Sequence, residues 1–258
     1  ITTNQYSFSG QLLQTVLRHE KKSTNPQNYL VITKMEYDDL GRLLNIKKNI
    51  NSTGENTIAS NSYDALGQLK KKTVGSKKNP STNTYYSPRQ PLQEQAYEYN
   101  IRGWLLNVNK AYMSNANANQ YFAMELGYDK NASYGTFAPV YNGNIAGMLW
   151  KSEGDQEKRK YDFNYDAVNR LTAAAFTQYA SGSGESATFD NSANVDFSVS
   201  GLTYDANGNI KAMAQNGLKL NTSIPIDQLT YTYNSNSNKL LKVVDAITPD
   251  HKLGDFKD

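Results

Sequence analysis

The chain has 258 residues and no cysteine, and its 27 basic and 24 acidic side chains leave a net charge of +3. The lack of cysteine excludes disulfides, thiolate metal sites and cysteine nucleophiles. A charge so small and so scattered argues against a nucleic-acid partner. No apolar run approaches the roughly 20 residues that a membrane helix needs.

Composition indicates the kind of fold. Hydrophobic residues make up only 38% of the chain, yet there are 19 tyrosines. Disordered chains combine high net charge with few aromatic residues, which is not the pattern here. A tyrosine ring can be covered while its hydroxyl stays in water. The composition therefore favours a wide sheet tiled by Tyr and Asn over a thick aliphatic core.

One short pattern recurs along the chain: a tyrosine, an Asp or Asn, two variable residues, a Gly or Asn, one further residue, and a Leu or Ile. Such self-similarity indicates a repeat architecture. The first, second and fifth positions are Tyr37, Asp38 and Gly41; Tyr63, Asp64 and Gly67; Tyr99, Asn100 and Gly103; Tyr165, Asp166 and Asn169; and Tyr204, Asp205 and Gly208. A worn copy begins with Tyr233 and Asn234.

Each copy predicts a β-hairpin. Asp or Asn at the first turn position accepts hydrogen bonds from backbone N–H groups further along, which favours a type I turn. Glycine three residues later supplies the positive φ that closes such a turn with a bulge. Asn169 takes that place in one copy, and asparagine is the non-glycine residue that best tolerates left-handed geometry.

Taken in chain order, the elements are regular hairpins joined by irregular connections. Residues 6–13 predict a shortened first hairpin, and residues 29–33 are the best strand candidate of the first third. Between about 106 and 150 the repeat decays into an irregular insert, in which residues 115–124 allow one helical turn. Residues 179–199 predict a flexible loop between two hairpins. Because the motif resumes at 204, residues 1–258 are predicted to form a single all-β domain.

These repeats resemble the YD-repeat, or Rhs, family of bacterial surface and toxin-delivery proteins, whose pattern is Tyr-Asp-x-x-Gly-Arg/Asn-Leu. Four copies match the pattern well and two are worn, and together they span nearly the whole chain. The abundance of asparagine and the closing residues 253–258 are similar to Rhs chains of Bacteroidetes type.

The resemblance implies repeated antiparallel hairpins stacked into a large curved or spiralling, solenoid-like sheet. In full-length members this sheet wraps into a hollow shell around a C-terminal toxic polypeptide. The resemblance further implies a secreted or cell-surface location, with the rest of the parent polypeptide, including an encapsulated toxin, as partner. Such members also carry a self-cleaving aspartyl segment. This chain shows no such segment, so the resemblance implies a fragment of the shell wall.

Residues that could carry other chemistry are few. His19 and His251 are the only histidines, and neither has the spacing of a ligand pair or a catalytic triad. The stretch that begins at Asp205 alternates oxygen-bearing residues as a calcium loop does, but Ile210 and Asn216 stand where such a loop needs Gly and Glu. We therefore predict no metal, no cofactor and no enzymatic activity. A hydrolase whose acidic residues meet only in three dimensions is the least favoured alternative.

Aromatic residues offer a second functional hypothesis, a carbohydrate-binding adhesin module. Aromatic faces bind sugar rings and peptides, although a repeated tyrosine more often packs one hairpin on the next. The two tryptophans are harder to explain by packing, because they differ from the residues that the repeat otherwise has at those positions. The candidate binding residues are Tyr97, Tyr99, Trp104, Tyr112, Trp150 and Tyr161.

Stacked hairpins leave two bare sheet edges, which invite pairing with another chain. We therefore expect either edge-to-edge self-association or unusual caps, at residues 6–13 and in the tail after Ile247.

Overall fold

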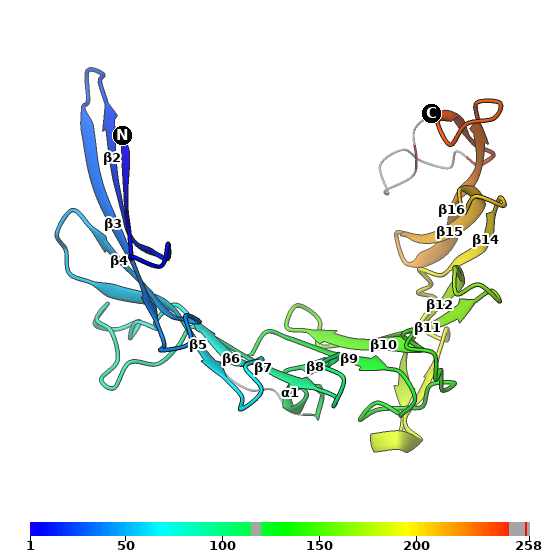
Figure 1. Ribbon diagram of the computed structural model, residues 1–258. Helices are drawn as coiled ribbons and strands as arrows, with labels where there is room; N and C mark the ends of the chain where they lie inside the picture. Colours follow the sequence, from blue (N-terminus) through cyan, green and yellow to red (C-terminus); the bar gives the residue numbers. More distant parts are fainter. Residues whose placement is uncertain (115–119, 248–255, 257–258) are drawn as a thin grey trace. The chain divides into compact units, whose positions relative to one another are not determined.

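The computed structural model describes residues 1–114, 120–247 and 256. Its contacts divide the chain into two compact units. Figure 1 labels the strands and the helix along the chain. Unit 1 comprises residues 1–109 and 117–121, and unit 2 comprises residues 110–116 and 122–258. Regular structure in both units is almost entirely antiparallel β, which confirms the predicted all-β stack of hairpins. That the whole of 1–258 forms a single domain stays a prediction.

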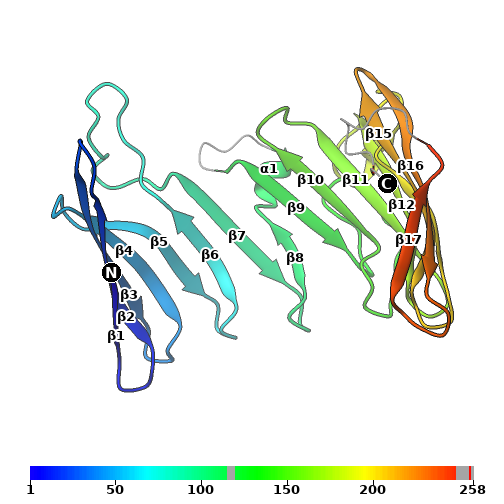
Figure 2. The same cartoon turned by 90° about the horizontal axis from the view of Figure 1, so that it is seen from above.

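Unit 1 is a meander in which each strand is antiparallel to the next. Figure 2 shows these strands side by side in chain order. They are β1 (Thr2–Tyr6), β2 (Leu12–Lys21), β3 (Gln27–Tyr37), β4 (Leu43–Ile50), β5 (Asn56–Tyr63), β6 (Leu69–Val74), β7 (Gln93–Tyr99) and β8 (Leu105–Val108). The predicted first hairpin is thus formed by β1 and β2.

Unit 2 continues the antiparallel pattern around one inserted strand, β13, which pairs only with β12 among the described residues. Its elements are α1 (Ala111–Ser114), β9 (Phe122–Gly127), β10 (Gly147–Ser152), β11 (Lys158–Tyr165), β12 (Leu171–Ser181), a 3-10 turn (Gly184–Ser186), β13 (Thr188–Asp190), β14 (Val199–Tyr204), β15 (Ile210–Lys219), β16 (Thr222–Tyr233) and β17 (Leu240–Asp245).

The two units bury their side chains to different extents. Among the described residues of unit 1, Val108 is the only buried hydrophobic residue, and most strand residues are half-buried. Unit 2 has a compact core in which α1 and the connection 128–146 cover one face of β9 and β10. Its buried residues are Tyr112, Met113, Ala123, Ala132, Phe137, Ala146 and Leu149.

Two glycines lie beneath the Phe137 ring at the centre of that core. Gly127 and Gly147 lie directly opposite each other on β9 and β10. An added Cβ would lie 2.3 Å from the Phe137 ring at Gly127 and 2.4 Å from it at Gly147. The Phe137 ring therefore occupies the space that two side chains would otherwise fill.

The structure adds detail to the predicted insert and loop. Of residues 115–124, where one helical turn was expected, residues 115–119 lie outside the described residues and residues 122–124 belong to β9; α1 ends at Ser114. The loop expected at 179–199 contains the end of β12, the 3-10 turn and β13, and its flexibility stays a prediction. Phe189 holds this segment in place, because its ring meets that of Tyr179 edge-on at 5.9 Å and packs against the core. Residues 115–119 and most of the tail after Ile247, including the closing segment 253–258 apart from residue 256, lie outside the described residues.

Candidate functional site: the joints between neighbouring hairpins

The repeated motif forms the turn that its residues predict. Gly41 has a φ of 80° and donates its backbone N–H to the Asp38 carbonyl over 2.9 Å. The Asp38 Oδ1 atom accepts the backbone N–H groups of Leu40 and Arg42 over 3.0 and 2.8 Å. The strand register shifts between Glu36 and Tyr37, as a bulge requires. The predicted type I turn with a bulge is confirmed at this copy.

The other copies repeat this geometry. The Asp or Asn Oδ1 atom accepts the N–H groups two and four residues on at Asp64, Asn100, Asp166 and Asp205. The fifth position has positive φ at Gly67, Gly103, Asn169 and Gly208. In the worn copy the left-handed residue is Asn236, at 55°, while Asn234 accepts the N–H of Ser237. Asparagine thus replaces glycine where the turn requires a left-handed residue.

A tyrosine hydroxyl connects each of these hairpins to the one before it. The Tyr63 hydroxyl donates to the backbone carbonyl of Leu43, which ends the preceding motif, over 2.9 Å. Among the described residues the same donor and acceptor positions recur in at least six pairs, with at least three in each unit. The other five pairs are Tyr37 with Leu12 (3.0 Å), Tyr99 with Leu69 (3.1 Å), Tyr165 with Ile145 (2.8 Å), Tyr204 with Leu171 (2.6 Å) and Tyr233 with Ile210 (2.9 Å).

The residue after the left-handed position reaches over the next turn. The Arg42 guanidinium lies 4.7 Å from the centre of the Tyr63 ring. Arg170 lies 4.6 Å from the Tyr204 ring and donates to the Asp205 carbonyl over 3.1 Å. Amides act in the same way elsewhere, as Asn209 does by donating to the Asn238 side chain over 2.9 Å. We call the tyrosine bond and this overlying side chain together a joint.

Strand register is the same at five of these joints. The residue two positions after the acceptor Leu or Ile lies opposite the residue three positions before the next motif tyrosine. The observed pairs are Gln14 with Lys34, Asn45 with Ser60, Lys71 with Ala96, Gly147 with Asp162, and Ala212 with Thr230. The β12–β14 interface, where β13 is inserted, pairs Ala174 with Val199 instead.

Hydrogen bonds within the turns lower the pKa of three motif aspartates. For Asp38 and Asp166 the largest cause is the backbone N–H of Arg42 and of Arg170. For Asp205 it is the side-chain amide of Asn209. Donors of this kind stabilise the charged carboxylate, so each of these carboxyl pKa values lies below the usual 3.8. The three aspartates therefore accept the turn hydrogen bonds as ionised carboxylates.

Three of the six aromatic candidates lie in unit 1, and each of them has a contact within it. Tyr99 is a joint residue, and the Tyr97 hydroxyl donates to Gln95 over 3.0 Å. Trp104, which follows the turn, has the Arg102 guanidinium 5.2 Å from its ring centre. All three are half-buried. Their role in binding stays a prediction.

The other three lie in unit 2, in two different settings. Trp150 and Tyr161 stack on one face of β10 and β11, with ring centres 5.3 Å apart, and Phe163 continues the row 6.0 Å beyond Tyr161. Tyr112 is fully buried in the core, and its hydroxyl bonds with Glu153. Burial and the nearby carboxylate raise the pKa of Tyr112 to about 12. Tyr112 is thus a core residue and not the surface contact that we expected.

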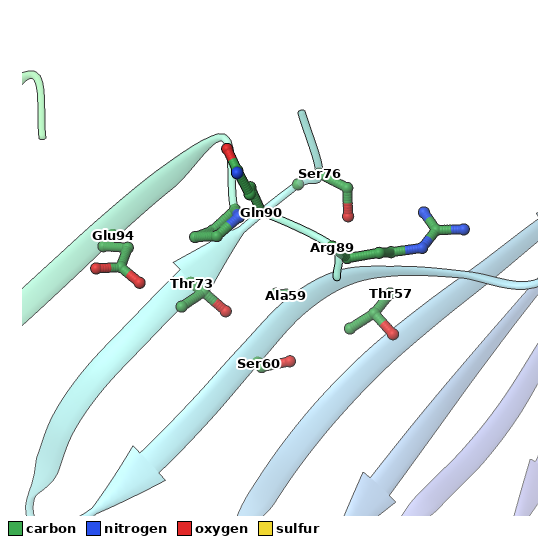
Figure 3. Close-up of a pocket in the computed structure, with 10 residues that line it drawn as sticks. Thr57, Ala59, Ser60, Thr73, Ser76, Arg89, Gln90 and Glu94 are labelled. Carbon is green, nitrogen blue, oxygen red and sulfur yellow. The ribbon is translucent and has the colours of Figure 1, made fainter. Parts of the chain in front are cut away.

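A polar hollow of about 320 Å³ opens on one face of unit 1 (Figure 3). Ser60, Thr73 and Glu94 lie opposite one another on β5, β6 and β7 and form part of its floor. Its charged residues already have partners. Glu94 pairs with Lys71 over 2.8 Å, and Arg89 lies over the Tyr85 ring at 4.0 Å. The hollow is therefore a hydroxyl-lined part of the sheet surface.

Within the described residues, no three His, Asp or Glu side chains lie close enough together to hold a metal ion. No helix within the described ranges has the length and apolar character needed to cross a membrane.

The turns and the recurring tyrosines were predicted from the sequence, but the hydrogen bond from the tyrosine hydroxyl and the carbonyl that accepts it were not. The motif Leu or Ile recurs in the sequence, and its side chain suggests only a strand residue. What the next hairpin uses is its backbone carbonyl, which every residue type possesses. The regular recurrence of this position immediately after the turn is the one signal that could have identified it.

No protein-family model and no curated protein matches the chain. Among solved structures, the crystal structure of TcdB2-TccC3-TEV matches with a TM-score of 0.26 and 14% identity, over 92% of this chain and 17% of that chain. The Photorhabdus luminescens Tc holotoxin pore matches with a TM-score of 0.23 and 13% identity, over 95% of this chain and 15% of that one. The chain thus spans about a sixth of the length of these weak structural neighbours. A likeness at this level supports no inference about function.

Proposed function

We propose that the chain is a non-enzymatic structural module, part of the wall of a YD-repeat shell that encloses or presents a polypeptide. The observation that carries this proposal is the joint, which recurs at least six times among the described residues with the same donor and acceptor positions. A single hairpin is marginally stable in water, and repeat arrays gain stability from contacts with their neighbours. The residues that the sequence repeats are therefore those that hold hairpins side by side.

Unit 1 shows how such a wall could contain a polypeptide without gripping it. Its sheet has almost no buried core, so most of its side chains remain partly exposed. Charges that lie across neighbouring strands pair with each other, as Lys71 does with Glu94 and Lys47 with Glu36. A surface of paired charges and hydroxyl groups presents few unsatisfied groups to a chain that lies against it.

The motif acids support a non-enzymatic role. Asp38, Asp166 and Asp205 are committed to accepting turn hydrogen bonds, with lowered pKa values that keep them ionised. A general acid needs a raised pKa instead. We propose a secreted or cell-surface location, with the remainder of the parent polypeptide, including a toxin, as partner.

Limited proteolysis of the complete polypeptide that carries this chain tests the shell. We expect the segment that follows the repeats to be protected while the wall is intact. Replacing Tyr37, Tyr63 and Tyr99 by Phe should speed its cleavage, because three joints of unit 1 lose their hydroxyl donors. Tyr29→Phe is the matched control, since Tyr29 is an exposed tyrosine outside the motif. Equal cleavage in the joint variant and in the unaltered protein would overturn the proposal.

A carbohydrate-binding role remains the second candidate, on the basis of one observation. Trp150, Tyr161 and Phe163 form a continuous half-buried row on one sheet face of unit 2. Such a row could stack against sugar rings. Binding on a glycan array that disappears in Trp150→Ala and persists in Trp104→Ala would support this role, and a lack of binding to any glycan would remove it.

A further inference from the structure

Two asparagine side chains cover the turn at Asn169 in unit 2. Asn144 lies directly before the acceptor residue Ile145, where other joints have the side chain that reaches over the next turn. Its amide donates to the Asn169 Oδ1 atom over 3.1 Å. The amide of Asn142 donates to the same oxygen atom. The joint between Tyr165 and Ile145 thus includes two amide donors that converge on one acceptor.

Asn142 precedes Gly143 and is exposed in the connection between β9 and β10. The backbone nitrogen that follows an asparagine can attack its side-chain amide carbon and expel ammonia, which makes asparagine a thermolabile residue. Glycine hinders this attack least, because it has no Cβ and its backbone is conformationally permissive. Gly143 has a φ of 95°, and among the described residues its N–H donates to no acceptor. The attacking nitrogen is therefore available in the folded chain.

The amide carbonyl of Asn142 is held and polarised by the chain itself. Its Oδ1 atom accepts the backbone N–H of Asn144 over 3.1 Å. A fixed donor at this oxygen stabilises the negative charge that develops on it when the carbon is attacked. The same bond keeps the amide folded back towards the next two backbone nitrogens, and the first of these is the attacking one.

Two other asparagines share this carbonyl geometry but not the glycine. Asn79 and Asn100 each accept the N–H of the residue two positions on, over 2.9 Å. Asn79 precedes Pro80, which has no N–H. Asn100 precedes Ile101, whose side chain branches at Cβ and hinders the attack. Of these three asparagines, Asn142 alone combines the bonded carbonyl with an unhindered nitrogen.

The chain has two other Asn-Gly pairs, at 207–208 and 216–217. In the first pair, the glycine N–H already donates to the Asp205 carbonyl over 3.1 Å. In the second pair, the asparagine lies within β15, its amide donates to Asp196 over 2.7 Å, and its glycine is buried. The fold thus binds the attacking nitrogen of one pair and encloses that of the other, and it does neither at 142–143.

We propose that Asn142 is a site of spontaneous deamidation that weakens the joint at Tyr165. The Gly143 nitrogen loses its proton to hydroxide and bonds to the Asn142 side-chain carbon. The bond from that carbon to the amide nitrogen breaks, and ammonia leaves with a proton from water. A second water then opens the succinimide ring at either carbonyl, which gives aspartate or isoaspartate.

The product loses a donor where the joint needs one. A carboxylate has no N–H, so two acceptors face each other where the Asn142 amide met the Asn169 Oδ1 atom. Asn144 still donates to that oxygen. A new donor for the carboxylate therefore requires that the amides of both Asn144 and Asn169 reverse. Isoaspartate further lengthens the backbone of the connection by one methylene group.

Peptide mapping by mass spectrometry, on the folded chain kept in mildly alkaline buffer, measures the reaction at all three pairs in one sample. Asn142 and Asn207 both lie in an Asn-Gly-Asn sequence, so Asn207 is the matched internal control. We expect Asn142 to convert several-fold faster than Asn207 and Asn216. In concentrated urea the three rates should converge, because the fold alone distinguishes the pairs. Conversion of Asn142 that is no faster than that of Asn207 in the folded chain would overturn the proposal.

The variant Asn142→Asp tests the effect on the joint separately, since it introduces the product's carboxylate without the reaction. We expect hydrogen exchange of the backbone amides in the turn 166–170 to become several-fold faster. Tyr141→Asp is the control, because it places the same charge on a neighbouring side chain that is 78% exposed, and exchange in the turn should not change. Equal exchange in Asn142→Asp and the native chain would show that deamidation leaves the joint intact, and would overturn this part of the proposal.

Discussion

Unit 1 and unit 2 use the same hairpin but are stabilised differently. Unit 1 keeps to the repeat and has a single buried hydrophobic residue, Val108, among its described residues. Unit 2 departs from the repeat in the insert at 106–150, and there it has a core of Tyr112, Phe137 and Leu149. The core cluster thus lies where the motif decays, while the regular hairpins of unit 2 also bury side chains such as Phe176, Ile226 and Leu229. The regular hairpins of both units are connected by joints.

The largest effect on stability is expected when a side chain of similar size is truncated in each unit. Leu149→Ala removes a fully buried side chain and should cost about 2–5 kcal/mol. Ile46→Ala removes a half-buried one and should cost about 1 kcal/mol, a fraction of the value for full burial. Urea denaturation, with hydrogen exchange followed separately in each unit, measures both. Similar losses in the two units would show that unit 1 has a core comparable to that of unit 2.

Turn strain provides the next test, because both units depend on one left-handed residue per hairpin. Gly67→Val should cost about 1–3 kcal/mol, since Gly67 has a φ of 83°. Gly67→Asn is the matched control and should cost much less, as Asn169 adopts a φ of 68° at the same position in unit 2. Thermal unfolding of the two variants separates these outcomes. A neutral Val variant would mean that the turn tolerates any residue.

The sequence predicts the regular hairpins better than it predicts the core of unit 2. Tyr, Asp and Gly at fixed spacing predict the turns at Asp38 and Asp166, because turn chemistry is local and acts through side chains. The core of unit 2 was not predicted. The Phe137 ring lies on Gly127 and Gly147. These two glycines belong to different strands, and only the strand register places them opposite each other. The hydrogen bond of the joint was not predicted. The repeated tyrosines were expected to pack one hairpin on the next with their hydroxyls in water, whereas the hydroxyls donate to backbone carbonyls.

Joint hydroxyls should have smaller effects that are alike in the two units. Tyr63→Phe in unit 1 and Tyr204→Phe in unit 2 each remove one hydrogen bond to a backbone carbonyl, at a cost of about 1 kcal/mol. The Leu43 carbonyl keeps the bond that the Asn61 side-chain amide donates over 3.0 Å, so the loss in Tyr63→Phe should not exceed that in Tyr204→Phe. Because the two sites share no partner, the double variant should show additive losses. Urea midpoints of the single and double variants test this. A loss confined to Tyr204→Phe would indicate that joints matter only where a core accompanies them.

Acid should weaken the turns of both units by the same mechanism. The folded state lowers the pKa of Asp38, Asp166 and Asp205 below the usual 3.8, so it binds fewer protons than the unfolded chain. The resulting stability is present above pH 3.8 and is lost as the pH falls through the lowered pKa values of the folded state. Replacing all three by Asn keeps an Oδ1 acceptor, as in the Asn100 turn, but removes the titration. The triple variant should therefore lose less stability in acid than the native chain, as measured by urea midpoints on either side of pH 3.8. An identical acid loss in the triple variant and the native chain would place the acid-sensitive groups outside the motif.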